Sequence, residues 1–340
     1  MRIFFVGDFT SETGPSIANN MLRKGLEGKD ILYSNAKTKP MRIIELILNA
    51  LRSDCVCFCS YSQLNFIGMK IAKVLQKKTF YIMHGYRTYE YKINKEFCDN
   101  DELKKINDTE KNLFKSVDKV FCVSKKFMEY MKKVEPAFEE KFDYNYNCID
   151  FDKMQKEAKG IIKRKKDNQI VSIGGGMRQK NILTICKAIE KLNQKNGIKL
   201  RLIVIGLPYT DKESICSYDF VTYYDRLPHE KVLEILSESS LYIQNSTFET
   251  FGLAVIEALT VECNLLLSKN IGAIDLITTI KDNDVIYDIY DECEIARKID
   301  GVLKESNAIN LRVGLSIDEA SYKTSATKLY NKINKFMEEG

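Results

Sequence analysis

Two glutamates in one segment have surroundings that suit a ligand site. In residues 245–259, Glu249 falls in a predicted loop after a strand, and Glu257 lies about two turns into the following helix, near its apolar stripe. A carboxylate in such a place is costly to bury unless it accepts hydrogen bonds, and sugar or ribose hydroxyls can supply them in pairs. The segment therefore predicts a site for a hydroxyl-rich ligand. Backbone N–H groups at the start of the helix face the same ligand, around Phe251, Gly252 and Leu253.

A second segment combines glycines with positive charge. Gly174, Gly175 and Gly176 follow a predicted strand, and Arg178 and Lys180 precede a predicted helix. Glycine lets a backbone approach a ligand closely, and the start of a helix favours anions. The segment predicts a clamp for a diphosphate. The alternative is a glycine turn with two surface cations.

Two loops in the first half of the chain are weaker candidates. Gly14 lies in a small polar loop after the first predicted strand, and His84 ends a later strand just before Gly85. A histidine at that position either faces a ligand or has a purely structural role, and the sequence leaves both interpretations open. The loop at Gly14 lacks the Gly-x-Gly-x-x-Gly fingerprint of dinucleotide-binding proteins.

Alternating apolar runs and helical stretches must position these residues. We expect ten strands, at about residues 2–6, 30–34, 55–59, 79–83, 119–123, 169–173, 200–205, 220–223, 241–243 and 265–267. Helices separate most of them, which predicts parallel sheets, and a charged stretch at 153–167 interrupts the rhythm. The pattern predicts two doubly wound α/β halves that join near residue 155 and face a central cleft. Ligands of parallel sheets bind beyond the carboxyl ends of the strands.

Composition limits the class of protein. A chain of 340 residues with 44% hydrophobic and 29% charged residues fits two soluble domains, and its net charge of +5 is too small to indicate nucleic acid. The ten cysteines include Cys55, Cys57 and Cys59, which we interpret as a buried strand rather than a metal site. With two histidines far apart, no zinc spacing is present. We expect a cytoplasmic protein, because neither a signal peptide nor an apolar run of ~18 residues is visible.

The segment from Glu249 to Glu257 resembles the Glu-x7-Glu motif of retaining GT-B glycosyltransferases, specifically glycosyltransferase family four. Residues 147–150 resemble the family's Asn-Gly-Ile-Asp at the domain junction, and 227–230 resemble its turn before the helix that precedes the motif. The resemblance implies an α/β fold of the GT-B type. It implies an acceptor-side Rossmann-like domain at 1–155, a nucleotide-sugar-binding one at 156–315, and a last helix, 316–340, that packs back on the first domain.

The resemblance also implies roles for single residues. Glu249 would contact donor-sugar hydroxyls, Glu257 the ribose, and Lys180 the diphosphate. His84 would lie against the transferred sugar, and Gly14 would fall in the loop that approaches the donor. The family usually has an arginine five residues before the lysine. Gly175 occupies that position here, and whether Arg178 replaces the arginine is left open.

The implied activity is transfer of a hexose-type sugar from a UDP-sugar or GDP-sugar, with retention of configuration and without a metal or cofactor. The implied acceptor is a glycan or a lipid-linked sugar, in bacterial surface polysaccharide or glycolipid assembly. Peripheral contact with the inner face of the cell membrane is a further expectation, through the apolar segment 41–51 and lysine pairs at 125–126 and 132–133. One alternative is a non-catalytic GT-B-like protein that binds a nucleotide sugar or an interaction partner. The other is an enzyme of a different class, a dehydrogenase or a nucleotide-sugar epimerase.

Overall fold

The computed structural model describes residues 1–11, 13–35, 38–95, 98–161, 165–196 and 199–339. The chain forms two compact units. The first comprises Met1–Tyr89, Asp99–Asp150 and Ile317–Gly340, and the second comprises Glu90–Cys98 and Phe151–Ser316. Helix α4 (Arg87–Asn94) begins in the first unit and ends in the second. That assignment of residues 90–98 was not expected from the sequence.

A parallel six-stranded sheet forms the centre of the first unit, in the order β2-β1-β3-β4-β5-β6. Its strands are β1 (Ile3–Val6), β2 (Ile31–Tyr33), β3 (Cys55–Phe58), β4 (Lys78–Met83), β5 (Lys119–Cys122) and β6 (Phe142–Tyr144). All four residues of β1 and of β3 are buried, so side chains on both faces of these strands lie in the core. The prediction of a buried strand is confirmed for Cys55 and Cys57, and Cys59, which follows the strand, is fully buried as well.

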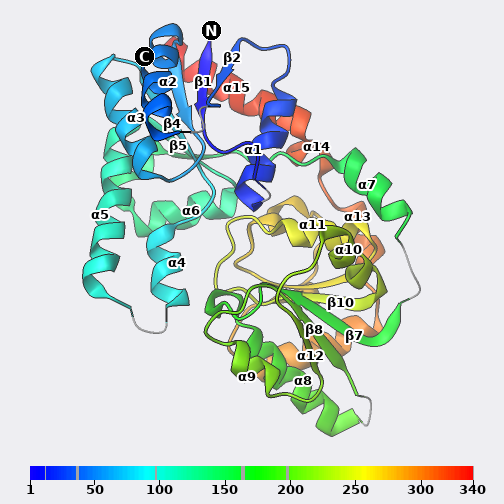
Figure 1. The fold of residues 1–340 in the computed structure, drawn as a ribbon. Coiled ribbons are helices and arrows are strands. Elements are labelled where there is room, and N and C mark those ends of the chain that lie inside the picture. Colours follow the sequence, from blue (N-terminus) through cyan, green and yellow to red (C-terminus); the bar gives the residue numbers. More distant parts are fainter. Residues whose placement is uncertain (12, 36–37, 96–97, 162–164, 197–198, 340) are drawn as a thin grey trace. The chain divides into compact units, whose positions relative to one another are not determined.

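Helices cover both faces of this sheet. They are α1 (Gly14–Gly25), α2 (Lys39–Arg52), α3 (Gln63–Val74), α5 (Asn100–Ser116), α6 (Lys125–Val134), α14 (Ile317–Ala320) and α15 (Tyr322–Glu339), with a 3-10 helix at Pro136–Lys141. In Figure 1, α1 and α15 lie on one side of the sheet, and α2, α3 and α5 lie on the other. Helices α1 and α15 touch at Gly25, where a Cβ would overlap the carbonyl of Tyr322.

The end of the chain is tied to the segment that follows β6. The Ile149 N–H donates to the carbonyl of Ala320 at 2.9 Å, and the Tyr322 N–H donates to the carbonyl of Ile149 at 2.8 Å. This bridge interrupts the terminal helix at Ser321, so the single helix predicted for 316–339 is two helices. The Asn145 side chain adds a hydrogen bond of 2.9 Å to the Ser325 hydroxyl.

The second unit repeats the arrangement with a parallel sheet in the order β12-β11-β10-β7-β8-β9. Its strands are β7 (Lys166–Ile173), β8 (Arg201–Ile205), β9 (Val221–Tyr224), β10 (Ser239–Gln244), β11 (Asn264–Ser268) and β12 (Val285–Ile286). Strand β10 pairs with β7 and β11, so the chain segments that leave β7 and β10 emerge side by side at one edge. This order confirms the α/β class with parallel sheets.

The helices of this unit are α7 (Phe151–Lys159), α8 (Ile182–Asn196), α9 (Lys212–Cys216), α10 (His229–Glu238), α11 (Leu253–Thr260), α12 (Glu292–Lys304) and α13 (Ala308–Val313). Short 3-10 helices occur at Arg178–Lys180, Gly272–Leu276 and Asp282–Asp284. Helices α8 and α12 pack together, and their buried side chains share one core with those of the sheet. Helices α10 and α11 pack together over the other face (Figure 1). The charged stretch at 153–167 contains most of α7, while its residues 162–164 lie outside the described part.

Candidate functional site

Lys180 and Glu249, which are 69 positions apart in the chain, form an ion pair in the second unit. Lys180 ends the 3-10 turn after β7, and Glu249 lies in the loop after β10, so the adjacency of these two strands brings the side chains together. Their side chains are 18% and 16% exposed, so most of the pair is withdrawn from water while part of it stays open to solvent. The structure thus brings together Lys180, which the sequence predicts to bind a diphosphate, and Glu249, which it predicts to contact the donor sugar.

The loop that carries Glu249 is held by two neighbouring segments. The Thr247 N–H donates to the Gln179 carbonyl at 2.8 Å, and the Gln179 side chain donates to the Phe248 carbonyl at 2.8 Å. On the other side, the Glu249 N–H donates to the Asn270 carbonyl at 3.0 Å, and the Gly272 N–H donates to the Glu249 carbonyl at 3.0 Å. With its backbone fixed on both sides, Glu249 has a defined position before any ligand arrives.

Two buried polar side chains on β10 extend the pair into the core. The Gln244 side chain donates to Glu249 Oε2 at 3.0 Å, and the Tyr242 hydroxyl donates to Gln244 Oε1 at 2.8 Å. Burial raises the pKa of the Tyr242 phenol well above its usual value, and the Glu249 carboxylate adds to the effect. The tyrosine therefore stays a proton donor, which orients the amide towards Glu249. Neither residue was predicted from the sequence, although Gln244 is a polar residue at the carboxyl end of a strand.

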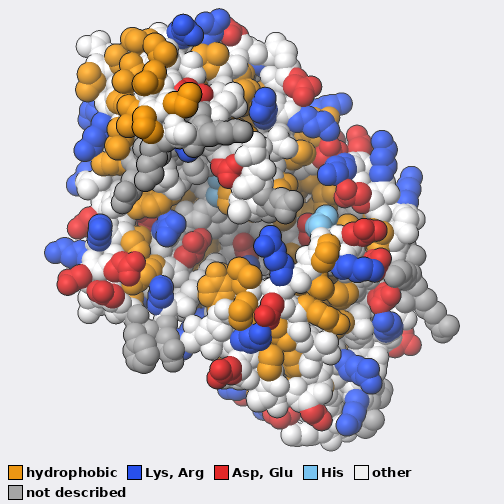
Figure 2. All heavy atoms as spheres, viewed as in Figure 1, with side chains coloured by type: hydrophobic (Ala, Val, Ile, Leu, Met, Phe, Trp, Pro, Cys, Tyr) orange, Lys and Arg blue, Asp and Glu red, His pale blue; other side chains and the backbone are white. Residues whose placement is uncertain are grey.

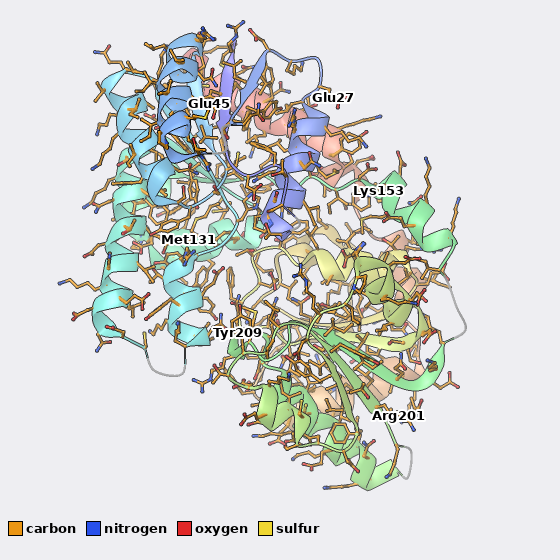
Figure 3. All side chains as sticks on the ribbon, in the orientation of Figure 1. Glu27, Glu45, Met131, Lys153, Arg201 and Tyr209 are labelled. Carbon is orange, nitrogen blue, oxygen red and sulfur yellow. The ribbon has the colours of Figure 1, made fainter. Side chains whose placement is uncertain are left out.

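The glycine run after β7 has a structural explanation. The N–H groups of Gly174 and Gly175 donate to the Ile205 carbonyl at 2.7 and 3.1 Å, and that of Gly176 donates to the Leu207 carbonyl at 3.2 Å. Gly175 has φ +58°, and a Cβ there would overlap the backbone of residues 206 and 207. At Gly176 a Cβ would come 2.7 Å from the carbonyl oxygen of Tyr209, which Figure 3 labels. These three N–H groups are therefore engaged with the last residue of β8 and the segment that follows it.

Gly174 contributes differently, because the aliphatic part of Lys180 lies against it. Its φ of +141° suits glycine, and a Cβ would overlap the Lys180 side chain. Arg178 is turned elsewhere: its Nε lies 3.4 Å from Asp211 Oδ1, and its Nη1 lies 3.5 Å from the Lys95 carbonyl oxygen. Arg178 and Lys180 belong to a 3-10 turn that ends at Lys180. Asn181 follows in the left-handed conformation, before α8 begins.

Glu257 lies on the same short helix that follows the Glu249 loop. Gly252, at φ +99°, caps the start of α11, and a Cβ there would come 3.4 Å from the Glu249 side chain. In an α-helix the first N–H groups lack carbonyl partners in a preceding turn. At the start of α11 the Val255 N–H donates to the Gly252 carbonyl at 3.1 Å, and the Phe251 ring is buried. Glu257 Oε1 lies 3.0 Å from His229 Nε2 on α10, a contact that the sequence did not indicate.

His84 belongs to the first unit, at the end of β4. Its Nε2 lies 2.9 Å from Asn19 Oδ1, and the Asn19 amide nitrogen donates to the carbonyls of Asp8 at 3.1 Å and Cys59 at 3.3 Å. Since both amide protons point to carbonyls, the Asn19 oxygen accepts, and the proton of His84 resides on Nε2. Burial lowers the pKa of His84 to about 4, so the imidazole is neutral near pH 7.

Gly14 is the first residue of α1, also in the first unit. It is exposed, and a Cβ built on it would meet no atom within 4 Å. The loop before it is organised by Asp8, whose carboxylate accepts from the N–H groups of Thr10 at 3.0 Å and Ser11 at 3.1 Å. Hydrogen bonds from Ser11 and Thr10 lower the pKa of Asp8 to about 2. Packing in the described part of the chain does not require glycine at position 14.

Two kinds of feature are absent from the described residues. No group of three or more His, Cys, Asp or Glu side chains is placed to hold a metal ion there. Within the same residues, no helix has both the length and the apolar character needed to cross a membrane.

Comparison with known proteins links the second unit to one family. Residues 153–316 match the family described as glycosyl transferases group 1. The chain is 29% identical over 106 residues to the phosphatidylinositol N-acetylglucosaminyltransferase GPI3 subunit of Saccharomyces cerevisiae, a match that covers 31% of this chain and 22% of the relative. The aligned part thus spans about a fifth of the length of that curated relative.

Similar solved structures span nearly the whole chain. Sucrose-phosphate synthase from Thermosynechococcus elongatus superposes with a TM-score of 0.72 at 15% identity and covers 100% of both chains. HepE from Anabaena, in complex with UDP and glucose, superposes with a TM-score of 0.69 at 12% identity and covers 98% of this chain and 100% of its own. At these identities the likeness establishes the fold. The chain therefore has the GT-B fold, and its residues 153–316 match the family described as glycosyl transferases group 1.

Proposed function

We propose that the protein is a retaining glycosyltransferase that moves a hexose-type sugar from a nucleotide-diphosphate sugar to a glycan or lipid-linked acceptor. The observation that carries the proposal is the Lys180–Glu249 pair, in which a cation for the leaving diphosphate meets a carboxylate for the sugar that is held on a fixed loop. The family match over residues 153–316 and the UDP in the HepE structure support the same assignment.

In the proposed reaction, the bond between the anomeric carbon and the diphosphate oxygen breaks, and a bond from that carbon to the acceptor oxygen forms. The acceptor proton passes to the leaving diphosphate, which accounts for every atom without a separate base. Lys180 has three N–H donors, so it can bind the diphosphate while it keeps Glu249 as a partner. The developing charge on the diphosphate is stabilised by Lys180 and by the start of α11.

The other predicted site residues take supporting roles in this proposal. Glu257 binds the ribose, and Gly174 leaves room for the Lys180 side chain. Arg178 contributes less than Lys180, because it is already paired with Asp211. In the first unit we assign His84 to the transferred sugar, where a neutral imidazole can accept or donate a hydrogen bond, and Gly14 to the loop that approaches the donor.

The proposal requires no metal ion or cofactor, because the diphosphate charge is met by Lys180 and the helix start. Asp8 ionises readily, and its Oδ1 accepts hydrogen bonds from the Thr10 and Ser11 N–H groups of its own loop. Activity that survives prior treatment with EDTA supports metal independence, and activity that returns only with added Mg²⁺ or Mn²⁺ contradicts it.

A lipid-linked acceptor is supported by α2 in the first unit. Its residues Met41, Ile44, Leu48 and Leu51 recur at helical spacing and are 46–62% exposed, while Leu46 and Ala50 are buried. Figure 2 shows hydrophobic side chains gathered over this helix. An apolar stripe of this kind suits the interface of a membrane. We therefore propose a cytoplasmic protein that touches the inner face of a bacterial membrane during surface polysaccharide or glycolipid assembly.

The test is sugar transfer. Purified protein is incubated with radiolabelled UDP-sugars and GDP-sugars, with and without lipid extract, and the anomeric configuration of the product is read by NMR. Label in a glycan or lipid product, with the anomeric configuration of the donor, supports the proposal. Nucleotide-sugar binding without transfer or hydrolysis supports the non-catalytic alternative, and an inverted product contradicts the retaining mechanism.

A further inference from the structure

His229 connects the helix before the candidate site to Glu257. It is the first residue of α10, directly after Pro228, and its Nε2 lies 3.0 Å from Glu257 Oε1 on α11. The Glu257 side chain is 20% exposed and that of His229 is 56% exposed. A carboxylate has about four lone-pair positions, so this bond leaves Glu257 with acceptor positions for ligand hydroxyls.

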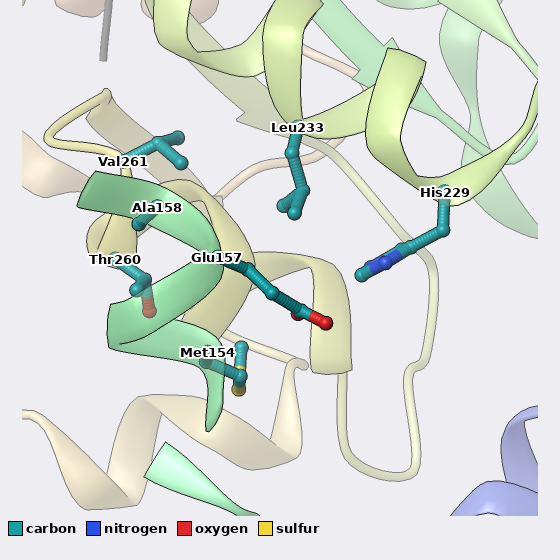
Figure 4. A pocket seen from close by; sticks show the side chains of 7 residues that line it. All are labelled: Met154, Glu157, Ala158, His229, Leu233, Thr260 and Val261. Atoms are coloured by element: carbon teal, nitrogen blue, oxygen red, sulfur yellow. The ribbon is translucent and has the colours of Figure 1, made fainter. Parts of the chain in front are cut away.

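A second carboxylate approaches the same imidazole from α7. A small pocket lies between α7, α10 and the end of α11, lined mainly by Met154, Glu157, His229, Leu233, Thr260 and Val261. Figure 4 shows the side chains of Glu157 and His229 directed towards each other across it. His229 therefore stands between two glutamates of different helices, and an imidazolium there offsets the repulsion between them.

The other charged groups around His229 are few in the described part of the chain. Lys153, also on α7 and labelled in Figure 3, acts against protonation of the imidazole, and it forms an ion pair with Glu157 at 3.6 Å. Of the strands packed against α10, β10 presents the Tyr242 phenol, and β7 contributes Lys166, which pairs with Glu238 at the opposite end of α10. The hydrogen bond to Glu257 dominates and raises the pKa of His229.

We propose that His229 is a positioning residue for the nucleotide: its imidazolium holds the Glu257 carboxylate in the orientation that receives the ribose hydroxyls. The inference rests on the proposed function, because it takes Glu257 as the ribose ligand. It adds a residue outside the Glu-x7-Glu segment to the site. It also makes the protonation state of a single side chain a determinant of donor affinity.

The pH dependence has a definite sign. The folded pKa of His229 lies above the unfolded value of about 6.5, so the ion pair is fully present below pH ~6.5 and is lost as pH rises through the folded pKa. Nucleotide affinity should fall over the same interval. Linkage is reciprocal, so a bound nucleotide that favours the imidazolium must raise the pKa of His229 further. Competition between His229 and the ribose for Glu257 would instead lower it.

The chain suits a direct measurement, because His84 and His229 are its only two histidines. NMR titration of the imidazole signals, with the His229→Asn variant for assignment, gives the pKa of His229 in the free protein and with UDP, GDP or ADP. Inorganic pyrophosphate is the control for charge, since it lacks a ribose. We expect the bound nucleotide to raise the pKa of His229 more than pyrophosphate does. An unchanged or lowered pKa overturns the inference.

Variants test the same inference by affinity. His229→Ala removes one hydrogen-bonded partner of a half-exposed ion pair. We therefore expect this variant to bind nucleotide about 3–10-fold more weakly, as measured by calorimetry at pH 6.5. The loss should shrink at pH 8.5, and His229→Asn should recover part of it. Glu230→Ala, which changes the exposed neighbour on the same helix, is the matched control and should bind within twofold of the parent protein.

The two proposals fail in different ways. If the unaltered protein binds none of UDP, GDP and ADP, the proposed function fails and the role of His229 fails with it. If a nucleotide binds normally but His229→Ala and the pH change leave its affinity unaltered, only the role of His229 is overturned. Melting curves without nucleotide establish that each variant is folded.

Discussion

Replacement of Lys180 by methionine tests the ion pair without removing the side chain's packing. Methionine keeps an unbranched apolar stem against Gly174 but leaves the Glu249 carboxylate without its cation. Loss of one partner of a fully buried ion pair costs about 3–5 kcal/mol. Here the two side chains are 18% and 16% exposed and the Gln244 amide still donates to Glu249, so we expect about 2–3 kcal/mol. For a unit of this size, that lowers the melting temperature by roughly 4–12 °C.

The double variant Lys180→Met/Glu249→Gln separates stability from catalysis. With both charges removed, no uncompensated charge remains, and most of the lost stability should return. Turnover should stay at least ~100-fold low in Lys180→Met and in the double variant, because the group that stabilises the leaving diphosphate is absent in both. Calorimetric melting curves and donor kinetics on the four proteins complete the cycle. Stability losses that simply add in the double variant would refute the coupling that the structure describes.

Three further predictions follow from single features. Glu249→Gln should mainly lower kcat, whereas Glu257→Gln should mainly raise KM for the donor and weaken the binding of nucleoside diphosphate. Donor kinetics and calorimetry measure these effects, and the reverse pattern contradicts the two assignments. Gly175→Ala should destabilise the protein by more than ~2 kcal/mol, because φ is +58° and the Cβ meets backbone, and a melting temperature like that of the parent contradicts this. Deletion of residues 322–340 uncovers the α1 surface around Gly25 and should lower the melting temperature of the first unit, and an unchanged melting curve would argue against that packing.

The sequence predicted most of the strands because they are apolar on both faces. Elements with little apolar signal were missed: β6 is the tripeptide Phe-Asp-Tyr, and β12 has two residues. Helix α7 was hidden because its charged residues outnumber its apolar ones, although Phe151 and Ala158 are buried. The break at Ser321 depends on a backbone bridge to Ile149, a long-range contact that local sequence does not encode.

For the candidate site, sequence indicated residue types but not their partners. Lys180 and Glu249 meet because β7 and β10 are neighbours in the sheet, and this order follows from the fold rather than from either segment. The direction of Arg178 depends on a 3-10 turn before α8, whereas the sequence predicted only that Arg178 and Lys180 precede a helix. The contact between His229 and Glu257 likewise depends on how α10 packs against α11.

Gly175 illustrates a physical constraint that the motif comparison alone did not reveal. It stands where the family usually has an arginine, yet its backbone conformation and the proximity of residues 206 and 207 leave no room for a side chain. The charge of the clamp must therefore come from other positions in this chain. The roles of the individual site residues stay predictions until they are measured.

The central claim is that the second unit binds a nucleoside diphosphate through Lys180. The most direct measurement is calorimetric titration of UDP, GDP and ADP into the unaltered protein and into Lys180→Met, with melting curves that show both to be folded at the assay temperature. We predict that at least one nucleotide binds the unaltered protein and that its affinity falls by about tenfold or more in the variant, the equivalent of one lost charge-assisted contact. Binding of none of the three, or equal affinity in the two proteins, would contradict it.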